Sequence, residues 1–254
     1  MSHVKLIVTD LDNTLLRRDK TISDYTIDVL RRVRERGIKV AFATARDFRY
    51  ITEHLAPMFG YLPDIIVADN GAIARYDGMN VFVRSIPVAT ANALMKCVER
   101  TRAISSESKY IIRESEHKVT EHWSVGKPNT VVAESIDGVT EDVLFFDGTI
   151  TDDVILAHYP NIRCVTYSDV NWSTFVHKEA TKQNALAAVI DTLDISYPEI
   201  AAFGDDFSDV EMLRECGVGV AMSNAIDECK SVADYVCDDC DDDGAAHWIE
   251  ENLL

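Results

Sequence analysis

Positive charge is scarce in this chain of 254 residues, which has 25 lysines and arginines against 43 aspartates and glutamates and a formal net charge of -18. Nucleic acids and anionic membranes are bound through basic patches, so we expect neither as a partner. An anionic substrate would need local positive charge to enter. Long apolar runs are also missing, since none approaches the roughly 18 residues of a membrane span. We therefore expect no membrane association.

A disulfide framework is absent as well. The cysteines are scattered without framework spacing, and no signal peptide precedes Val4, so we expect free thiols in a reducing cytoplasm. Cys237 and Cys240 form a CxxC, but no second CxxC or histidine pair completes a zinc site. The six cysteines are Cys97, Cys164, Cys216, Cys229, Cys237 and Cys240.

The composition is that of an ordinary globular protein. Apolar residues make up 47% of the chain, and its length fits one large domain or two smaller ones, enough to bury a core.

Two carboxylates close the first apolar stretch, VKLIVTDLDNTLL, over residues 4–16. Its β-branched run predicts a strand buried on both faces of a parallel sheet, and ligands bind at the carboxyl ends of such strands. Asp10 and Asp12 project to the same side only if extended geometry continues through Leu11. Two adjacent carboxylates repel unless a cation or a shared proton lies beside them. The alternative, that both cap a turn, stays open at this point.

Strand and helix patterns alternate in the next part of the chain. Ser23 is a suitable helix N-cap and Gly37 a suitable C-terminal stop. The second predicted strand ends at Thr44. Three strand-to-helix units in about 70 residues indicate a parallel sheet with right-handed crossovers. The predicted elements are a helix over 23–37, a strand over 38–43, a helix over 47–57 and a strand over 65–68.

The middle third, to about Lys178, has a different pattern that predicts a separate α+β module. We expect a turn over 76–78, a helix over 89–102 and strands over 109–113 and 143–146. The segment Phe146-Asp147-Gly148-Thr149 echoes the first stretch, but Phe145 stands where the other carboxylate would be. We therefore interpret it as a surface turn.

The alternating pattern returns after Thr181, a suitable N-cap for a helix with an apolar stripe. Lys182 falls in the first turn, where the helix dipole disfavours a cation unless helix and lysine both face an anion. A strand over 200–203 is followed by Asp205 and Asp209. Further along we expect a strand over 217–222, a turn over 223–225, a solvated acidic turn over 238–243 and a helix over 245–254.

Four segments in this order, DLDNTLL, ATAR, TKQNAL and GDDFSDVEML, resemble the four motifs of the haloacid dehalogenase-like (HAD) superfamily, in particular its Cof-type sugar-phosphatase branch. The segments ADNGA and GVAMSNA are similar as well. The resemblance covers nearly the whole chain. It implies an α/β fold in which residues 1–84 and 179–254 form a doubly wound parallel-sheet core and residues 85–178 form an inserted α+β cap.

The resemblance also implies a reaction: Mg2+-dependent hydrolysis of small phosphorylated metabolites such as sugar phosphates, through an aspartyl-phosphate. Asp10 would be the nucleophile. Asp12 would protonate the leaving oxygen and then activate the hydrolytic water. Thr44 and the backbone N-H of Ala45 would hold phosphoryl oxygens, and Lys182 would balance the charge of nucleophile and phosphate.

The same resemblance implies a metal site and further substrate contacts. Mg2+ would bind Asp10, the carbonyl of Asp12 and Asp205, with Asp209 a ligand directly or through water. Ser208 stands where the family usually has asparagine, so a phosphate-directed amide is replaced by a shorter hydroxyl. The expected substrate-binding residues are Ala45, Arg46, Ser208 and Asn224.

Two other functions fit the same motifs: a phosphomutase, which returns the phosphoryl group to its substrate, and a non-catalytic sensor of phosphometabolites. Retention of Asp10, Asp12, Lys182 and Asp205 argues against the sensor. We expect a small phosphoester substrate, a cytoplasmic location, and a monomer or weak homo-oligomer. Candidate substrate contacts in the cap are Arg113, His122, Trp123, Lys127, Trp172 and His177.

Overall fold

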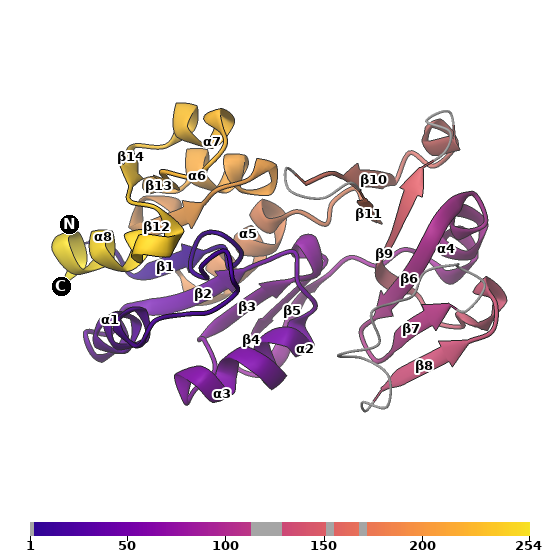
Figure 1. Cartoon of the computed structure of the whole chain (residues 1–254), viewed down its shortest axis with the longest axis horizontal. Helices are drawn as coiled ribbons and strands as arrows, with labels where there is room; N and C mark the ends of the chain where they lie inside the picture. The colour runs from indigo at the N-terminus through magenta and orange to yellow at the C-terminus, as the bar shows by residue number, and fades with distance from the viewer. Residues whose placement is uncertain (1–2, 113–128, 151–154, 168–171) are drawn as a thin grey trace. The chain divides into compact units, whose positions relative to one another are not determined.

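The computed structural model describes residues 3–112, 129–150, 155–167 and 172–254, and it contains two compact units. Met1–Phe82 and Thr181–Leu254 form the first unit, and Val83–Ala180 form the second. Figure 1 shows that the first unit joins the indigo amino-terminal part of the chain to the yellow carboxyl-terminal part.

The first unit is built on an eight-stranded sheet with the order β14-β13-β12-β1-β2-β3-β4-β5 (Figure 1). The strands from β14 to β3 are parallel, and β4 runs antiparallel to β3. Every residue of β1, β3, β12 and β13 is buried, as expected for central strands covered on both faces. The strands are β1 Leu6–Thr9, β2 Lys39–Ala43, β3 Ile65–Ala68, β4 Ile73–Tyr76, β5 Met79–Val83, β12 Ile200–Gly204, β13 Val218–Met222 and β14 Tyr235–Cys237.

Helices follow the strands of this unit in chain order. The α-helices are α1 Asp24–Glu35, α2 Phe48–Tyr50, α3 Ala56–Phe59, α5 Lys182–Leu193, α6 Val210–Glu215, α7 Asp227–Val232 and α8 Gly244–Leu253. A π-helical segment, Ile51–Leu55, joins α2 to α3, and short 3-10 turns cover Asp69–Gly71, Tyr197–Glu199, Phe207–Asp209 and Cys240–Asp242.

The predicted helix caps of this unit are confirmed. The Ser23 hydroxyl accepts from the N-H of Thr26 at 3.0 Å, and Gly37 follows the end of α1 with φ +82°. The Thr181 hydroxyl accepts from the N-H of Asn184 at 3.0 Å and begins α5. Because α5 begins here, Lys182 is its first residue.

The second unit contains a six-stranded sheet with the order β10-β11-β9-β6-β7-β8. Helix α4, Val88–Met95, packs on this sheet, and a core that includes Leu94, Phe146 and Phe175 lies between them. The strands are β6 Val98–Ser105, β7 Lys109–Ile112, β8 Thr130–Ala133, β9 Val143–Ile150, β10 Ile162–Val165 and β11 Ser173–His177. Two 3-10 turns, Ile136–Gly138 and Ile155–His158, complete the described part of this unit.

Two predictions for this unit were wrong. The helix expected over 89–102 ends at Met95, and Val98–Ser105 is strand β6, which pairs with β7 on one side and β9 on the other. Pairing along both edges outweighs the local helical preference of such a segment. The segment expected as a surface turn lies within β9, where Asp147 is 4% exposed and accepts a 2.6 Å hydrogen bond from the Thr174 hydroxyl. Asp147 also forms an ion pair with Arg102.

The acidic run over 238–243 forms a largely exposed turn, as predicted, and an arginine pairs with part of it. Asp239 caps the 3-10 turn Cys240–Asp242, and Arg18 binds both carboxylate oxygens of Asp239, at 2.7 and 2.8 Å.

All six cysteines are free, as predicted. None of the helices in the described part of the chain combines the length and apolar character that a membrane crossing requires.

Candidate active site

Three carboxylates and one lysine meet at the carboxyl end of the first unit's sheet. Asp10 follows β1 and Asp205 follows β12, and these strands are parallel neighbours, with Thr9 opposite Phe203. Asp209 lies in the turn after β12, and Lys182 opens α5. All four are at least nine-tenths buried, so their charges interact with little screening by water.

Lys182 lies at the centre of this group. Its Nζ is 2.6 Å from Asp10 Oδ1 and 2.7 Å from Asp209 Oδ1. The other oxygen of Asp209 accepts from the N-H groups of Asp205 and Asp206, at 3.1 and 3.2 Å. A lysine in the first helical turn thus faces two anions, the arrangement that the sequence left as one of two options.

The charges of the cluster are not balanced by Lys182 alone. Burial raises the pKa of Asp10 and of Asp205, and neighbouring carboxylates add to the rise, while Lys182 acts in the opposite direction. Burial opposes the charge of Lys182 too, but Asp10 and Asp209 outweigh it and raise the pKa of the lysine. The cluster therefore holds three buried carboxylates and one ammonium group, which contacts two of them.

The donor set fits a divalent cation. Asp10, Asp205 and Asp209 each offer a carboxylate oxygen, and these oxygens lie within 4.8 Å of one another. Anionic oxygen donors are the ligands that hard divalent cations prefer. A cation among them would lower the raised pKa values of Asp10 and Asp205.

The carboxylate of Asp12 points to different partners. Arg46 binds it through two parallel contacts, Nε to Oδ2 at 2.5 Å and Nη2 to Oδ1 at 2.6 Å, and Lys20 Nζ lies 2.9 Å from Oδ1. Burial opposes ionisation of Asp12, but these two cations more than offset it and lower its pKa. The Asp12 side chain is thus held ionised beside the acidic cluster rather than within it.

Thr44 and Ala45 follow β2, the neighbour of β1 on its other side. Thr44 is buried, and its hydroxyl oxygen accepts from the N-H of Arg46 at 3.1 Å. The Arg46 guanidinium lies 3.9 Å from the centre of the Tyr50 ring while it binds Asp12. Arg46 therefore uses Nε and Nη2 for Asp12, and its contact with a substrate stays a prediction.

The remaining predicted substrate residues differ in their placement. Ser208 is half-buried in the turn Phe207–Asp209 that also carries Asp209. Asn224 donates from Nδ2 to the carbonyl of Asn13 at 2.8 Å and accepts at Oδ1 from the N-H of Cys240 at 2.9 Å. Each end of its amide thus binds the main chain once, and the substrate contact of Asn224 stays a prediction.

Sequence reasoning missed two residues of this site. Thr14 donates its hydroxyl to Asp205 Oδ1 at 2.6 Å, and Lys20 binds Asp12. Thr14 belongs to the DLDNT segment, so its position in the motif was a usable signal. Lys20 lies in a loop without periodicity or motif, and no local pattern could have identified it.

The second carboxylate-rich group of the described chain, Asp239, Cys240 and Asp241, could also be read as a metal site. Arg18, however, donates to Asp239 and Asp241, so these charges are already paired within the protein. We assign no metal there.

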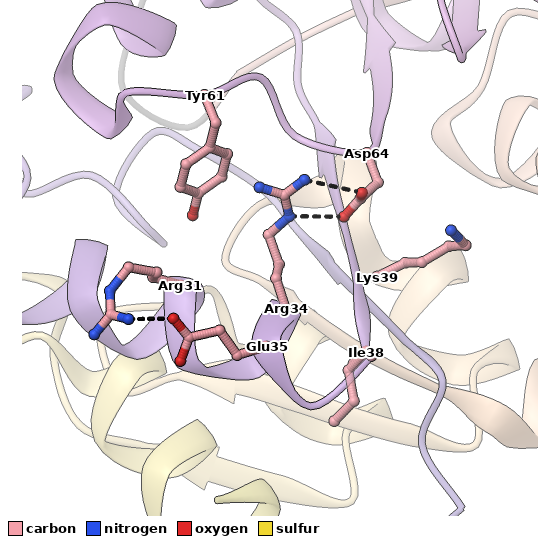
Figure 2. Close-up of a pocket in the computed structure, with 8 residues that line it drawn as sticks. Arg31, Arg34, Glu35, Ile38, Lys39, Tyr61 and Asp64 are labelled. Atoms are coloured by element: carbon pink, nitrogen blue, oxygen red, sulfur yellow. Dashed lines mark hydrogen bonds and ion pairs between the residues drawn. The ribbon is translucent and has the colours of Figure 1, made fainter.

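A pocket of about 380 Å³ lies at the opposite, amino-terminal end of β2 (Figure 2). Figure 2 shows two ion pairs in this pocket: Arg34 binds both oxygens of Asp64 at 3.1 Å, and Arg31 pairs with Glu35, while Lys39 points away from them. The pocket thus lies away from the buried carboxylates and Lys182. The pocket is lined by Arg31, Arg34, Glu35, Gly37, Ile38, Lys39, Tyr61 and Asp64.

Comparison with known proteins places the chain in a family. The sequence profile of haloacid dehalogenase-like hydrolases matches residues 7–249. The chain belongs to this family. As a HAD hydrolase it has the predicted α/β core with an inserted cap, which the solved structures of similar proteins support.

Two curated HAD relatives show the range of named activities. A 5-amino-6-(5-phospho-D-ribitylamino)uracil phosphatase of Bacillus subtilis is 27% identical and aligns over 97% of this chain and 96% of its own length. A phosphoglycolate phosphatase of Methanopyrus kandleri is 25% identical over 98% of this chain and 97% of its own length.

Two solved structures have the same fold. A HAD subclass IIB sugar phosphatase superimposes with a TM-score of 0.79 at 22% identity, with 98% of each chain covered. A haloacid dehalogenase-like hydrolase from Bacteroides thetaiotaomicron gives a TM-score of 0.82 at 23% identity, with 98% of this chain and 99% of the other covered.

Proposed function

We propose that this HAD hydrolase is a Mg2+-dependent phosphatase of small phosphorylated metabolites, with sugar phosphates as the first class to test. The observation that carries the proposal is the position of Lys182, whose Nζ lies 2.6 Å from Asp10 and 2.7 Å from Asp209 inside a buried group of three carboxylates. The names of the curated relatives, all phosphatases in the two cases described, support the same reaction.

In the proposed mechanism Asp10 attacks phosphorus and the bond from phosphorus to the leaving oxygen breaks. Asp12 gives a proton to that oxygen, so that the alcohol leaves and an aspartyl-phosphate remains on Asp10. Asp12 then takes a proton from a water molecule that attacks phosphorus, which releases phosphate and regenerates Asp10.

The other residues offset the negative charge of the site and hold the phosphoryl group in position. Lys182 stays between Asp10 and Asp209 and limits the repulsion between the nucleophile and the phosphate. Thr44 and the N-H of Ala45 hold phosphoryl oxygens, and Ser208 contributes its hydroxyl. Mg2+, when bound by Asp10, Asp205, Asp209 and the Asp12 carbonyl, supplies positive charge next to the transferred phosphoryl group.

Arg46 and Lys20 have a defined place in this scheme. Both bind the Asp12 carboxylate and lower its pKa, whereas the first step needs a protonated Asp12. A phosphate dianion brings about two negative charges and competes for the two cations. Substrate binding therefore weakens their hold on Asp12 and favours its protonation.

Residues 1–84 and 179–254 then form the catalytic core, and residues 85–178 form the cap that selects the substrate. In the described part of the cap, Trp172 is 43% exposed and His177 ends β11, so both remain candidates for substrate contact. The other four candidates, Arg113, His122, Trp123 and Lys127, lie outside the described residues. We propose a cytoplasmic enzyme that is a monomer or weak homo-oligomer.

The test is release of free phosphate by the purified chain. The panel contains p-nitrophenyl phosphate, sugar phosphates, phosphoglycolate and a phosphorylated ribitylaminouracil, with Mg2+ or with a chelator. We expect Mg2+-dependent release from wild type, none from Asp10→Asn, and wild-type release from the control Asp137→Asn, whose carboxylate is exposed. Transfer of the phosphoryl group from one position of the substrate to another, without release of free phosphate, would indicate a phosphomutase. Binding of a phosphorylated metabolite without Asp10-dependent turnover would indicate a sensor.

A further inference from the structure

Asn224 lies where two loops meet, and its side chain binds the main chain of both. Nδ2 donates to the carbonyl oxygen of Asn13 at 2.8 Å, in the loop that follows Asp10. Oδ1 accepts from the N-H of Cys240 at 2.9 Å, in the acidic loop that precedes α8. Each end of the carboxamide can be assigned from these partners, since only the nitrogen donates.

The Asn13 carbonyl belongs to a residue with a left-handed backbone. Asn13 has a φ of +59°, a conformation that asparagine adopts more readily than most residues other than glycine. The peptide that carries this carbonyl continues into Thr14, whose hydroxyl donates to Asp205 Oδ1 at 2.6 Å. The Asn13 carbonyl thus lies one residue before the side chain that binds Asp205.

The other partner of Asn224 is itself anchored. Cys240 is 1% exposed, and Arg18 binds the carboxylates on either side of it, those of Asp239 and Asp241. The main-chain N-H of Arg18 also donates to Asp241 Oδ1 at 3.0 Å. Asn224 thus joins the loop after the nucleophile to a second loop that is already held in place.

We propose that Asn224 is a positioning residue for the acidic cluster. By holding the Asn13 carbonyl, it keeps Thr14 and Asp205 in the arrangement that binds a divalent cation. The inference rests on the proposed function, because it requires that the cluster binds Mg2+. Partners that bind a metal ligand directly, as Thr14 binds Asp205, change metal affinity or activity by about 10- to 100-fold when they are removed. Asn224 acts through Thr14, so its effect belongs at the lower end of that range.

The experiment compares Mg2+ binding by wild type, Asn224→Ala and Asn224→Asp. The alanine variant loses both contacts, whereas the aspartate variant keeps an acceptor for Cys240 but has no donor for Asn13. Mg2+ affinity is measured from the rise in Tm with Mg2+ concentration in the absence of substrate. A second measurement is the Mg2+ dependence of p-nitrophenyl phosphate turnover. We expect both variants to bind Mg2+ about 10-fold more weakly, the lower end of that range.

The control is Asn252→Ala, which removes another half-buried amide that donates to a main-chain carbonyl, that of Trp248 at 2.8 Å. This variant should keep wild-type Mg2+ affinity. A purely structural role of Asn224 predicts a lower Tm without Mg2+ and an unchanged affinity, and that result would overturn the inference. If Asn224→Ala does not fold, Asn224→Ser is measured and interpreted in the same way. A wild-type protein whose Tm and turnover do not respond to Mg2+ would instead overturn the metal dependence in the proposed function.

Discussion

Arg46 binds both carboxylate oxygens of Asp12, with Nε 2.5 Å from Oδ2 and Nη2 2.6 Å from Oδ1. Such paired contacts are among the stronger hydrogen bonds in proteins and hold the carboxylate in one orientation. Lys20 contacts the same carboxylate at 2.9 Å. The proposed acid and base of the reaction is therefore held by two cations, and this arrangement can be tested through the pH dependence of the activity.

Replacing Arg46 should move the pH profile. Burial opposes ionisation of Asp12, so Arg46→Ala, with Lys20 alone remaining, raises the pKa of Asp12. The limb of kcat/KM against pH that reports Asp12 in the free enzyme then moves to higher pH. Arg46→Lys keeps the charge but not the forked geometry and should move the limb less. The control Arg214→Ala, at an exposed position on α6, should leave the pH profile unchanged. If the limb does not move in Arg46→Ala either, Arg46 does not lower the pKa of Asp12.

Much of the acidic cluster could be predicted because its residues follow buried strands. The apolar β-branched runs that become β1 and β12 end directly before Asp10 and Asp205. Carboxyl ends of parallel strands share one edge of a sheet, so side chains from distant parts of the sequence meet there. Strand periodicity and the order of the motifs therefore predict that these side chains meet, even though the loop conformations are unknown.

The contacts made by the loops could not be predicted in the same way. The main-chain partners of Asn224, Asn13 and Cys240, depend on two loop conformations that no periodic pattern encodes. The strand β6 was mistaken for a helix because its identity depends on pairing with β9, more than 40 positions away in places. The error in β6 arises because tertiary contacts, rather than local preference, decide the structure there.

Lys182 should contribute to stability as well as catalysis. In Lys182→Ala the buried carboxylates of Asp10 and Asp209 lose their shared cation, and removing one partner from a buried charge pair typically costs about 3–5 kcal/mol. We expect a loss of this order in the free energy of unfolding, measured by urea denaturation with a chelator present. Adding Mg2+ should restore part of the lost free energy of unfolding, because the cation supplies positive charge beside the carboxylates. The exposed control Lys178→Ala should change the free energy by less than about 0.5 kcal/mol, and an equally small change in Lys182→Ala would exclude this role.

Asp147 offers a test of the corrected structure of the second unit. Its buried carboxylate accepts from Thr174 and pairs with Arg102. Hydrogen bonds to charged groups contribute about 1.5–3 kcal/mol, so Asp147→Asn should lower the free energy of unfolding by a similar amount. The exposed Asp137→Asn should have little effect. If both variants unfold like wild type in urea, the segment behaves as the surface turn that the sequence suggested, not as part of β9.

Gly71 and Gly37 form a matched pair, because both have φ +82° but only Gly71 is closely packed. A Cβ at Gly71 would lie 2.2 Å from the carbonyl carbon of Thr181 and 2.5 Å from the N of Lys182, whereas a Cβ at Gly37 would meet nothing within 4 Å. Gly37→Ala should therefore cost only the left-handed conformation, about 1–2 kcal/mol, and leave turnover unchanged.

Gly71→Ala adds an overpacking cost of about 1–3 kcal/mol to the same conformational cost. The steric clash also pushes the start of α5 and moves the Lys182 ammonium away from Asp10. Misplacement of a catalytic group by about 1 Å can reduce the rate about 100-fold, so kcat should fall much further than in Gly37→Ala. Urea denaturation and Mg2+-dependent phosphate release measure the two effects on the same preparations. Equal stability and equal kcat in the two variants would show that close packing of Gly71 against Thr181 does not position the lysine.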